Sequence, residues 1–216
     1  MKHIAKNPEP AAFIHWKASQ RPAPSWSAFS GSLARDVVRQ SLLEEQGHIC
    51  CYCGKRIQSA DSHVEHLKPR SVYPQLALEY DNLLASCEGE NDAKTPNRDR
   101  HCGHRKGQWY NTTLMVSPLN ANCEEHFRYT LGGEILPTED PTGASAAQET
   151  IRRLGLDSSR LDSARRDAIT KLLTRLGQIT PATAARLIQG FNTRDAQGRY
   201  VPFCAAITYV LKRHCV

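Results

Sequence analysis

The chain has 216 residues, enough to form one large domain or two small ones with a genuine hydrophobic core. It carries 28 lysines and arginines against 22 aspartates and glutamates, a formal net charge of +6, which is compatible with nucleic-acid binding without establishing it. No apolar signal segment opens the sequence and no apolar run approaches membrane-spanning length, so we expect a cytoplasmic protein with no membrane contact. In a reducing compartment its cysteines are expected to bind metal rather than to form disulfides.

Residues 1–39 are predicted to form an N-terminal arm and the start of a helix. Four prolines before residue 25 exclude one continuous helix, and Phe13, Ile14 and Trp16 indicate a short turn that docks on the protein body. We expect these aromatic side chains to anchor the arm to its own core, with partner binding as the alternative. A helix is predicted over residues 30–47. Its expected apolar face consists of Leu33, Val37, Val38, Ser41 and Leu42.

A zinc site is predicted just past the end of this helix. Cys50 and Cys53 form a C-x-x-C pair in a tight turn, and Cys87 and Cys102 are the expected second pair. Because this second pair is widely split, a site in which His101 or His104 replaces one cysteine is the main alternative. Cys51, next to Cys50, is expected to face away from the metal and to serve as a small packing residue. Cys204 and Cys215 lack ligand-like spacing and are interpreted as buried or incidental thiols.

A carboxylate followed directly by a histidine lies between the two cysteine pairs. The alternation of residues 63–66 predicts a strand, and Pro69 ends it, so Glu65 and His66 are expected where the chain leaves regular structure. An imidazole can take a proton from water near neutral pH, and a carboxylate can hold a divalent cation against a phosphate. This pair therefore favours phosphodiester hydrolysis. Asn82 is expected to fix the loop that bears His66, or to serve as a simple turn residue.

After Cys102 a short helix is predicted, on which His104 is a candidate cation ligand and Arg105 and Lys106 are candidate phosphate contacts. A hairpin is predicted around Gly132 and Gly133, followed by a break at residues 140–145 that marks the expected subdomain boundary. Helices are predicted from residue 146 onward, with a final pair near residues 181–189 and 202–214. The expected basic residues of this region are Arg152, Arg153, Arg160, Arg165, Arg166, Lys171 and Arg175. A phosphate-binding role and a purely solvent-exposed role are both compatible with them.

Taken together, these motifs give the chain a recognisable pattern. The stretches that carry it are residues 7–17, 42–53, 63–69, 73–84, 86–87, 101–107 and 122–135. The chain resembles HNH (ββα-metal) endonucleases, and more narrowly the PtuB-type HNH proteins of Septu and retron anti-phage systems. The resemblance covers about the first two-thirds of the chain.

The resemblance implies a role for each matching residue. His66 is the general base that activates water, Glu65 is an acidic ligand of a catalytic Mg²⁺ or Mn²⁺, and Asn82 organises the site. The four cysteines at 50, 53, 87 and 102 are the implied ligands of a structural Zn²⁺. HNH helices often carry Asn, Asp or His directly after the last cysteine, whereas this chain has Gly103. The second ligand of the catalytic cation is therefore assigned to His104.

We thus expect an α+β protein in which a zinc-stapled ββα-metal core at residues 40–112 is embedded in a mainly helical body. Residues 113–145 are the expected hairpin and linker, and residues 146–216 the C-terminal helical region. The resemblance implies an endonuclease acting on DNA or RNA in anti-phage defence. Its implied partners are a PtuA-type ATPase and a retron reverse transcriptase with its DNA. The alternative is a non-catalytic, zinc-stapled module that binds nucleic acid or serves as an adaptor for the ATPase.

Overall fold

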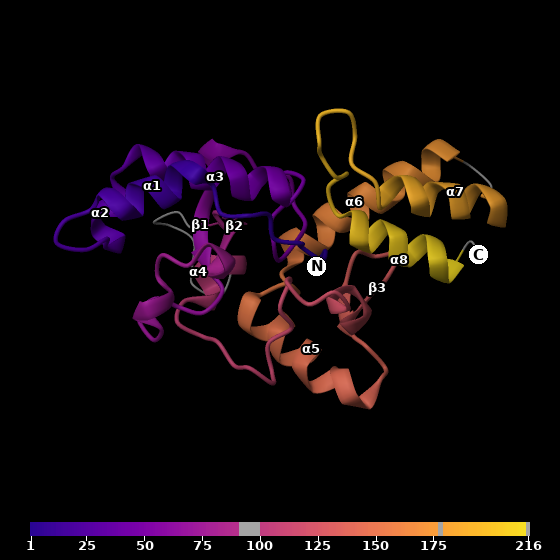
Figure 1. The fold of residues 1–216 in the computed structure, drawn as a ribbon. Helices are drawn as coiled ribbons and strands as arrows, with labels where there is room; N and C mark the ends of the chain where they lie inside the picture. The colour runs from indigo at the N-terminus through magenta and orange to yellow at the C-terminus, as the bar shows by residue number, and fades with distance from the viewer. Residues whose placement is uncertain (91–99, 177–178, 215–216) are drawn as a thin grey trace.

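The computed structural model of the chain describes residues 1–90, 100–176 and 179–214, and it has the mixed α+β architecture predicted from the sequence. The helices are α1 (Ala11–Ser19), α2 (Trp26–Ser30), α3 (Leu33–Glu45), α4 (Cys102–Lys106), α5 (Pro141–Leu154), α6 (Ser159–Leu176), α7 (Pro181–Phe191) and α8 (Cys204–His214). The strands are β1 (Ser62–His66), β2 (Leu83–Cys87), β3 (Phe127–Tyr129) and β4 (Ile135–Pro137). In Figure 1, α1 to α3 lie at one end of the molecule and α6 to α8 at the other.

A small antiparallel sheet, β1 paired with β2, lies at the centre of the N-terminal half. In its register Glu65 faces Leu84 and His66 faces Leu83. Both α3 and α4 pack against β2, and α4 also packs against α5 (Figure 1). The two strands and α4 form a ββα unit. The C-terminal half contacts this part of the protein through α5, which packs on α4, and through the segment before α8, where the Tyr200 N–H donates to the Gly47 carbonyl oxygen.

The N-terminal arm is anchored by aromatic side chains, as its proline-rich sequence predicted. The rings of Phe13 and Phe29 lie 4.9 Å apart, and Trp16 and Trp26 each pack against Phe29 at 5.4 and 5.2 Å. Phe13 and Phe29 are fully buried. The aromatic residues therefore hold α1 and α2 on the body of the protein, and the anchoring interpretation is confirmed.

The expected apolar face of α3 is wrong in part. Leu33 is 86% exposed and Val37 is 42% exposed, although both were assigned to the core. The buried residues are Ala34, Val38, Leu42, Leu43 and Glu45. This stripe follows a helical spacing of three and four residues but starts one position later than predicted. The misassignment arose because the sequence places a large apolar residue at the exposed first turn.

The hairpin predicted around Gly132 and Gly133 is confirmed, with Tyr129 paired to Ile135. The break predicted at residues 140–145 is wrong, because this segment begins α5. The Asp140 carboxylate accepts a hydrogen bond from the Thr142 N–H at 3.0 Å, and Pro141 occupies the first helical position. Proline is favoured there because its missing N–H has no helical partner in any case.

The C-terminal helices share the core of the rest of the protein. Among the described residues, one cluster of buried apolar side chains extends from Met1 to Leu211. The final helix pair predicted from the sequence is present as α7 and α8, which pack together, and Cys204 is buried. Cys215 lies outside the described residues, as do the side chains of Arg175 and Leu176.

One residue of the predicted basic face lies in the interior instead. Arg165 is buried, and its guanidinium donates hydrogen bonds to the carbonyl oxygens of Gly133 and Leu156 and to the Asp162 carboxylate. It therefore joins the hairpin to α6 and is not available to a phosphate. Among the described helices, none is long and apolar enough to cross a membrane.

Candidate active site and metal centre

Four cysteine side chains converge where α3, β2 and α4 meet. Cys50 and Cys53 lie in the turn after α3, Cys87 ends β2 and Cys102 begins α4. Their sulfur atoms all lie within 4.8 Å of one another, and those of Cys53 and Cys87 are 3.9 Å apart. Four thiolates placed tetrahedrally about 2.3 Å from a zinc ion would be separated by about 3.8 Å. The arrangement therefore fits a structural zinc ion.

The surroundings of this cluster also suit thiolates. The backbone N–H of Cys87 donates to the Cys50 sulfur at 3.4 Å, and that of Lys55 points to the Cys53 sulfur at 3.5 Å. His101 lies beside the cluster, with Nδ1 3.1 Å from the Cys102 sulfur. His101 can therefore form a hydrogen bond to the Cys102 sulfur, while the four cysteines themselves supply all four ligands of a tetrahedral zinc site.

Cys51 is chemically distinct from its neighbour Cys50. Burial raises the pKa of the Cys51 thiol well above its ordinary value, so this thiol stays protonated. For Cys50, burial also opposes ionisation, but hydrogen bonds from the other clustered thiols lower its pKa well below the ordinary value. Cys51 is buried and lies outside the four-cysteine group, which agrees with a packing role.

Glu65 projects from β1 into a network of polar groups. One carboxylate oxygen, Oε1, lies 2.9 Å from Nζ of Lys106 and accepts a hydrogen bond from the Tyr52 hydroxyl at 3.2 Å. The other oxygen, Oε2, lies 3.5 Å from Nε2 of His63. Burial alone would raise the pKa of Glu65, but the His63 contact and the Lys106 ammonium lower it. Glu65 is therefore ionised, with one oxygen engaged by Lys106.

His66, the last residue of β1, is held from two sides. Its Nε2 lies 3.0 Å from the carbonyl oxygen of Ala77, and its ring packs edge-on against Trp26 with centroids 4.4 Å apart. Burial lowers the pKa of His66 below its ordinary value. A neutral imidazole whose Nε2–H donates to a carbonyl keeps Nδ1 as a proton acceptor.

Glu65 and His66 open onto the same cavity, whose volume is about 400 Å³. Its other lining residues are Pro69, Arg70, Ser71, Lys106, Gly107 and Gln108. A carboxylate, a neutral imidazole and two cationic side chains thus face one solvent-accessible space. This combination can bind a phosphate group and remove a proton from a water molecule.

Asn82 stabilises the loop that follows β1. Its Oδ1 accepts a hydrogen bond from the Lys68 N–H at 2.8 Å, and its Nδ2 donates to the carbonyl oxygens of Lys68 and Leu76 at 3.0 and 3.1 Å. The Leu67 N–H in turn donates to the Asn82 carbonyl at 2.9 Å. The buried amide therefore fixes the segment immediately after His66.

His104 belongs to a different group of side chains. Its Nε2 lies 2.8 Å from Glu88 Oε2, and its ring centroid is 4.4 Å from that of His63. Gly103, next to it, has a clear packing reason: a Cβ there would lie 2.6 Å from both Glu65 Oε2 and His63 Nε2. The space that a side chain at position 103 would fill is occupied by Glu65 and His63.

Comparison with known proteins agrees with this geometry. Residues 50–97 match the family model of HNH endonucleases. The chain carries an HNH domain. The matched segment includes β1, β2 and three of the four clustered cysteines, and α4 follows it along the chain.

Two curated proteins show related sequences. The chain is 28% identical over 166 residues to a Vibrio cholerae protein named "Retron Vc95 putative HNH endonuclease", an alignment that covers 74% of this chain and 77% of the relative. It is 36% identical over 62 residues to the Septu protein PtuB of Bacillus thuringiensis, covering 28% of this chain and 24% of that relative. The chain is thus similar to a retron protein and, over a shorter segment, to a Septu protein, the two systems to which the sequence resemblance pointed.

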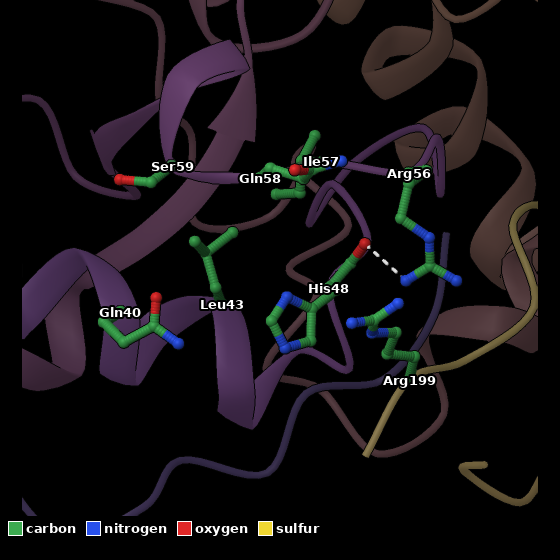
Figure 2. A pocket seen from close by; sticks show the side chains of 8 residues that line it. All are labelled: Gln40, Leu43, His48, Arg56, Ile57, Gln58, Ser59 and Arg199. Carbon is green, nitrogen blue, oxygen red and sulfur yellow. Dashed lines mark hydrogen bonds between the residues drawn. The ribbon is translucent and has the colours of Figure 1, made fainter. Parts of the chain in front are cut away.

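A second cavity, of about 380 Å³, lies at the edge of the HNH domain beside the C-terminal half (Figure 2). It is lined by Gln40, Leu43, His48, Arg56, Ile57, Gln58, Ser59 and Arg199. Arg56 donates to the carbonyl oxygens of His48, at 2.9 Å, and of Tyr200. This arginine therefore connects the turn before the cysteines to the segment that leads into α8.

Sequence reasoning missed two residues that contact the site, because His63 and Trp26 received no role there. Lys106, predicted to contact phosphate, lines the cavity but is largely buried and paired with Glu65. The i, i+2 spacing of His63 and Glu65 was a usable signal, because alternate residues of a strand share one face. The contact between Trp26 and His66 had no signal, since 40 residues separate them.

Proposed function

We propose that this chain is a metal-dependent endonuclease that hydrolyses phosphodiester bonds in nucleic acid. The observation that carries the proposal is the position of Glu65 and His66, which lie side by side at the end of β1 and line one cavity. A buried pair of this kind, on a strand braced by the four-cysteine cluster, gives the two reacting groups a fixed geometry.

In this mechanism His66 is the general base. Its Nε2–H donates to Ala77, so Nδ1 accepts a proton from a water molecule in the cavity. The oxygen of that water then attacks the phosphorus of the scissile bond. The edge contact with Trp26 restricts rotation of the ring, and the hydrogen bonds of Asn82 hold the following loop in place.

Glu65 is the proposed ligand of a Mg²⁺ or Mn²⁺ ion, which would stabilise negative charge on the phosphate and on the leaving oxygen. Because Lys106 and Tyr52 engage Oε1, the proposed metal ligand is Oε2, which lies 3.5 Å from His63 Nε2. Lys106 keeps the carboxylate ionised, and Arg70 contributes a second positive charge at the cavity. The second ligand assigned from the sequence, His104, stays a prediction. Its Nε2 contacts Glu88 Oε2 at 2.8 Å, a contact that does not involve Glu65.

The four-cysteine cluster is proposed to bind a structural Zn²⁺. Four thiolates complete a tetrahedral set and leave no position for a reacting water molecule, so this ion would hold the HNH domain together.

The remaining proposal concerns the biological context of the chain. The similarity to retron and Septu proteins supports a role as an effector in anti-phage defence, acting with a PtuA-type partner ATPase and, in a retron, with the reverse transcriptase and its DNA.

The decisive experiment compares the wild-type chain with His66→Ala on plasmid DNA and on total RNA, with Mg²⁺ or Mn²⁺, with and without the partner ATPase. The exposed His15 provides a matched control as His15→Ala. Loss of cutting in His66→Ala alone, with zinc content and fold retained, supports the proposal and identifies the substrate. Equal cutting by all three proteins would contradict it. Nucleic-acid binding without cutting under any condition would favour the non-catalytic alternative.

A further inference from the structure

His63, Glu88 and His104 converge from three separate parts of the HNH domain. His63 lies on β1, Glu88 directly follows β2 and His104 lies on α4. One potential ligand atom from each lies within 4.8 Å of the other two. The closest approaches are 2.8 Å between His104 Nε2 and Glu88 Oε2, and 3.6 Å between His63 Nδ1 and Glu88 Oε1.

The state of His63 distinguishes this group from an ordinary surface ion pair. Its Nδ1 is a buried polar atom without a hydrogen-bond partner among the described residues, and the 3.6 Å to Glu88 is too long for a hydrogen bond. A buried nitrogen in this condition is costly unless another group satisfies it. Since it faces a carboxylate and a second imidazole, a cation is the group that fits.

We propose that His63 Nδ1, His104 Nε2 and the Glu88 carboxylate form a binding site for a divalent transition-metal ion, separate from the four-cysteine cluster. Ligands about 2.1 Å from such an ion would lie roughly 3 to 3.5 Å apart, close to the 2.8 and 3.6 Å that separate Glu88 from the two histidines. Two imidazoles and one carboxylate select Mn²⁺, Co²⁺ or Zn²⁺ over Mg²⁺, which prefers oxygen ligands. Glu88 is 48% exposed at its side chain, so the site is open to solvent on one side.

The site would act on Glu65 through His63. With Nδ1 bound to an ion, the other ring nitrogen of His63 carries the proton, and this Nε2 faces Glu65 Oε2 at 3.5 Å. A ligating histidine that directs its second N–H to a carboxylate is a common arrangement, in which ion and carboxylate fix the ring between them. Gly103 makes this possible, because a side chain there would displace both groups. His63 is therefore a positioning residue for Glu65.

The test is a Co²⁺ titration of the full-length chain, loaded beforehand with one equivalent of zinc in the cysteine cluster. The wild-type chain should show a Co²⁺-binding step with weak visible absorption and without a thiolate charge-transfer band. His104→Ala and Glu88→Gln should each weaken this binding at least tenfold. The exposed residues His15 and Glu79 supply matched controls as His15→Ala and Glu79→Gln, which should bind as the wild type does.

Equal Co²⁺ affinity in all five proteins, or no uptake by the wild-type chain, would overturn the proposal. A large excess of Mg²⁺ should fail to displace the bound Co²⁺, and ready displacement would also count against it. Zinc content and circular dichroism verify that each variant is folded. Because no nucleic acid is present, the outcome does not depend on cleavage: it is decided by His104→Ala and Glu88→Gln, and His66→Ala should retain wild-type Co²⁺ binding.

Discussion

The Nε2 atom of His66 lies 3.0 Å from the carbonyl oxygen of Ala77. This contact assigns the ring proton to Nε2 and leaves Nδ1 as an acceptor, the state that a general base requires. Trp26 packs against the same ring from the N-terminal arm. The orientation of His66 is thus determined before any substrate binds, by a backbone carbonyl and by an aromatic side chain distant in the sequence.

Asn82→Ala should destabilise the loop after β1. The substitution removes three hydrogen bonds between the buried Asn82 amide and partly buried backbone groups of Lys68 and Leu76, and each unsatisfied buried group costs about 1–3 kcal/mol. Cleavage should fall as well, since this loop follows His66. Urea unfolding provides the free energy, with Asn122→Ala at an exposed asparagine as control. Equal stability of the two variants would show that the Asn82 amide does not hold the loop.

Lys106→Met should lower the free energy of unfolding, because it leaves the buried Glu65 carboxylate without its lysine partner. The Lys106 side chain is almost fully buried, and removing one member of a buried ion pair costs about 3 kcal/mol or more. Adding Glu65→Gln to this variant should restore part of the lost stability, because no uncompensated carboxylate then remains. A double-mutant cycle of unfolding free energies measures the coupling. Lys55→Met, at an exposed lysine, is the control, and a coupling energy near zero would contradict the pairing.

Loss of zinc should destabilise the HNH domain. Cys53→Ala and Cys102→Ala each remove one of the four clustered thiols and should lose the metal, whereas Cys51→Ala should keep one zinc per chain. We expect the Tm of the first two variants to fall by roughly 10 °C, which corresponds to about 3 kcal/mol for a chain of this size. Metal analysis and thermal unfolding test this. One zinc per chain in Cys102→Ala would exclude the four-cysteine ligand set.

Arg165 and Arg166 should differ sharply although they are neighbours in α6. Arg165→Ala removes buried hydrogen bonds to Gly133, Leu156 and Asp162, and should lower the free energy of unfolding by about 3 kcal/mol. Arg166→Ala affects an exposed side chain and should change it by less than about 0.5 kcal/mol. Thermal or urea unfolding of both variants provides the comparison. Similar stabilities would mean that the buried guanidinium is not needed to join the hairpin to α6.

The sequence predicted the local features of the fold well where one short segment determined them. The strand at residues 62–66 and the hairpin around Gly132 follow from local alternation and turn residues. The gathering of the four cysteines, which come from separate parts of the sequence, was predicted instead from their chemistry as metal ligands. The break at residues 140–145 was misread because proline, glycine and serine also form helix starts. Here the Asp140 carboxylate caps the first turn of α5 and Pro141 takes its first position, a local helix-start signal that the prediction overlooked.

The polar site was predictable only in outline. Glu65, His66 and Asn82 stood out through their residue types and spacing, but their partners come from elsewhere in the chain. Tyr52, Trp26 and Ala77 reach them through tertiary packing, which a linear pattern does not encode. The prediction that Arg165 belongs to an exposed basic face was wrong for the same reason, since its sequence context matches that of an exposed helical arginine.

The central claim is that His66 activates water for phosphodiester hydrolysis. Its most direct test is the single-turnover cleavage rate of the wild-type chain and of His66→Ala at saturating Mg²⁺ or Mn²⁺, on the nucleic acid that the wild type cuts. Both proteins must contain one structural zinc and unfold at similar temperatures. The account predicts a rate lower by roughly 10²- to 10⁴-fold in the variant. A rate within a factor of about two of the wild type would contradict the assignment of His66 as the general base.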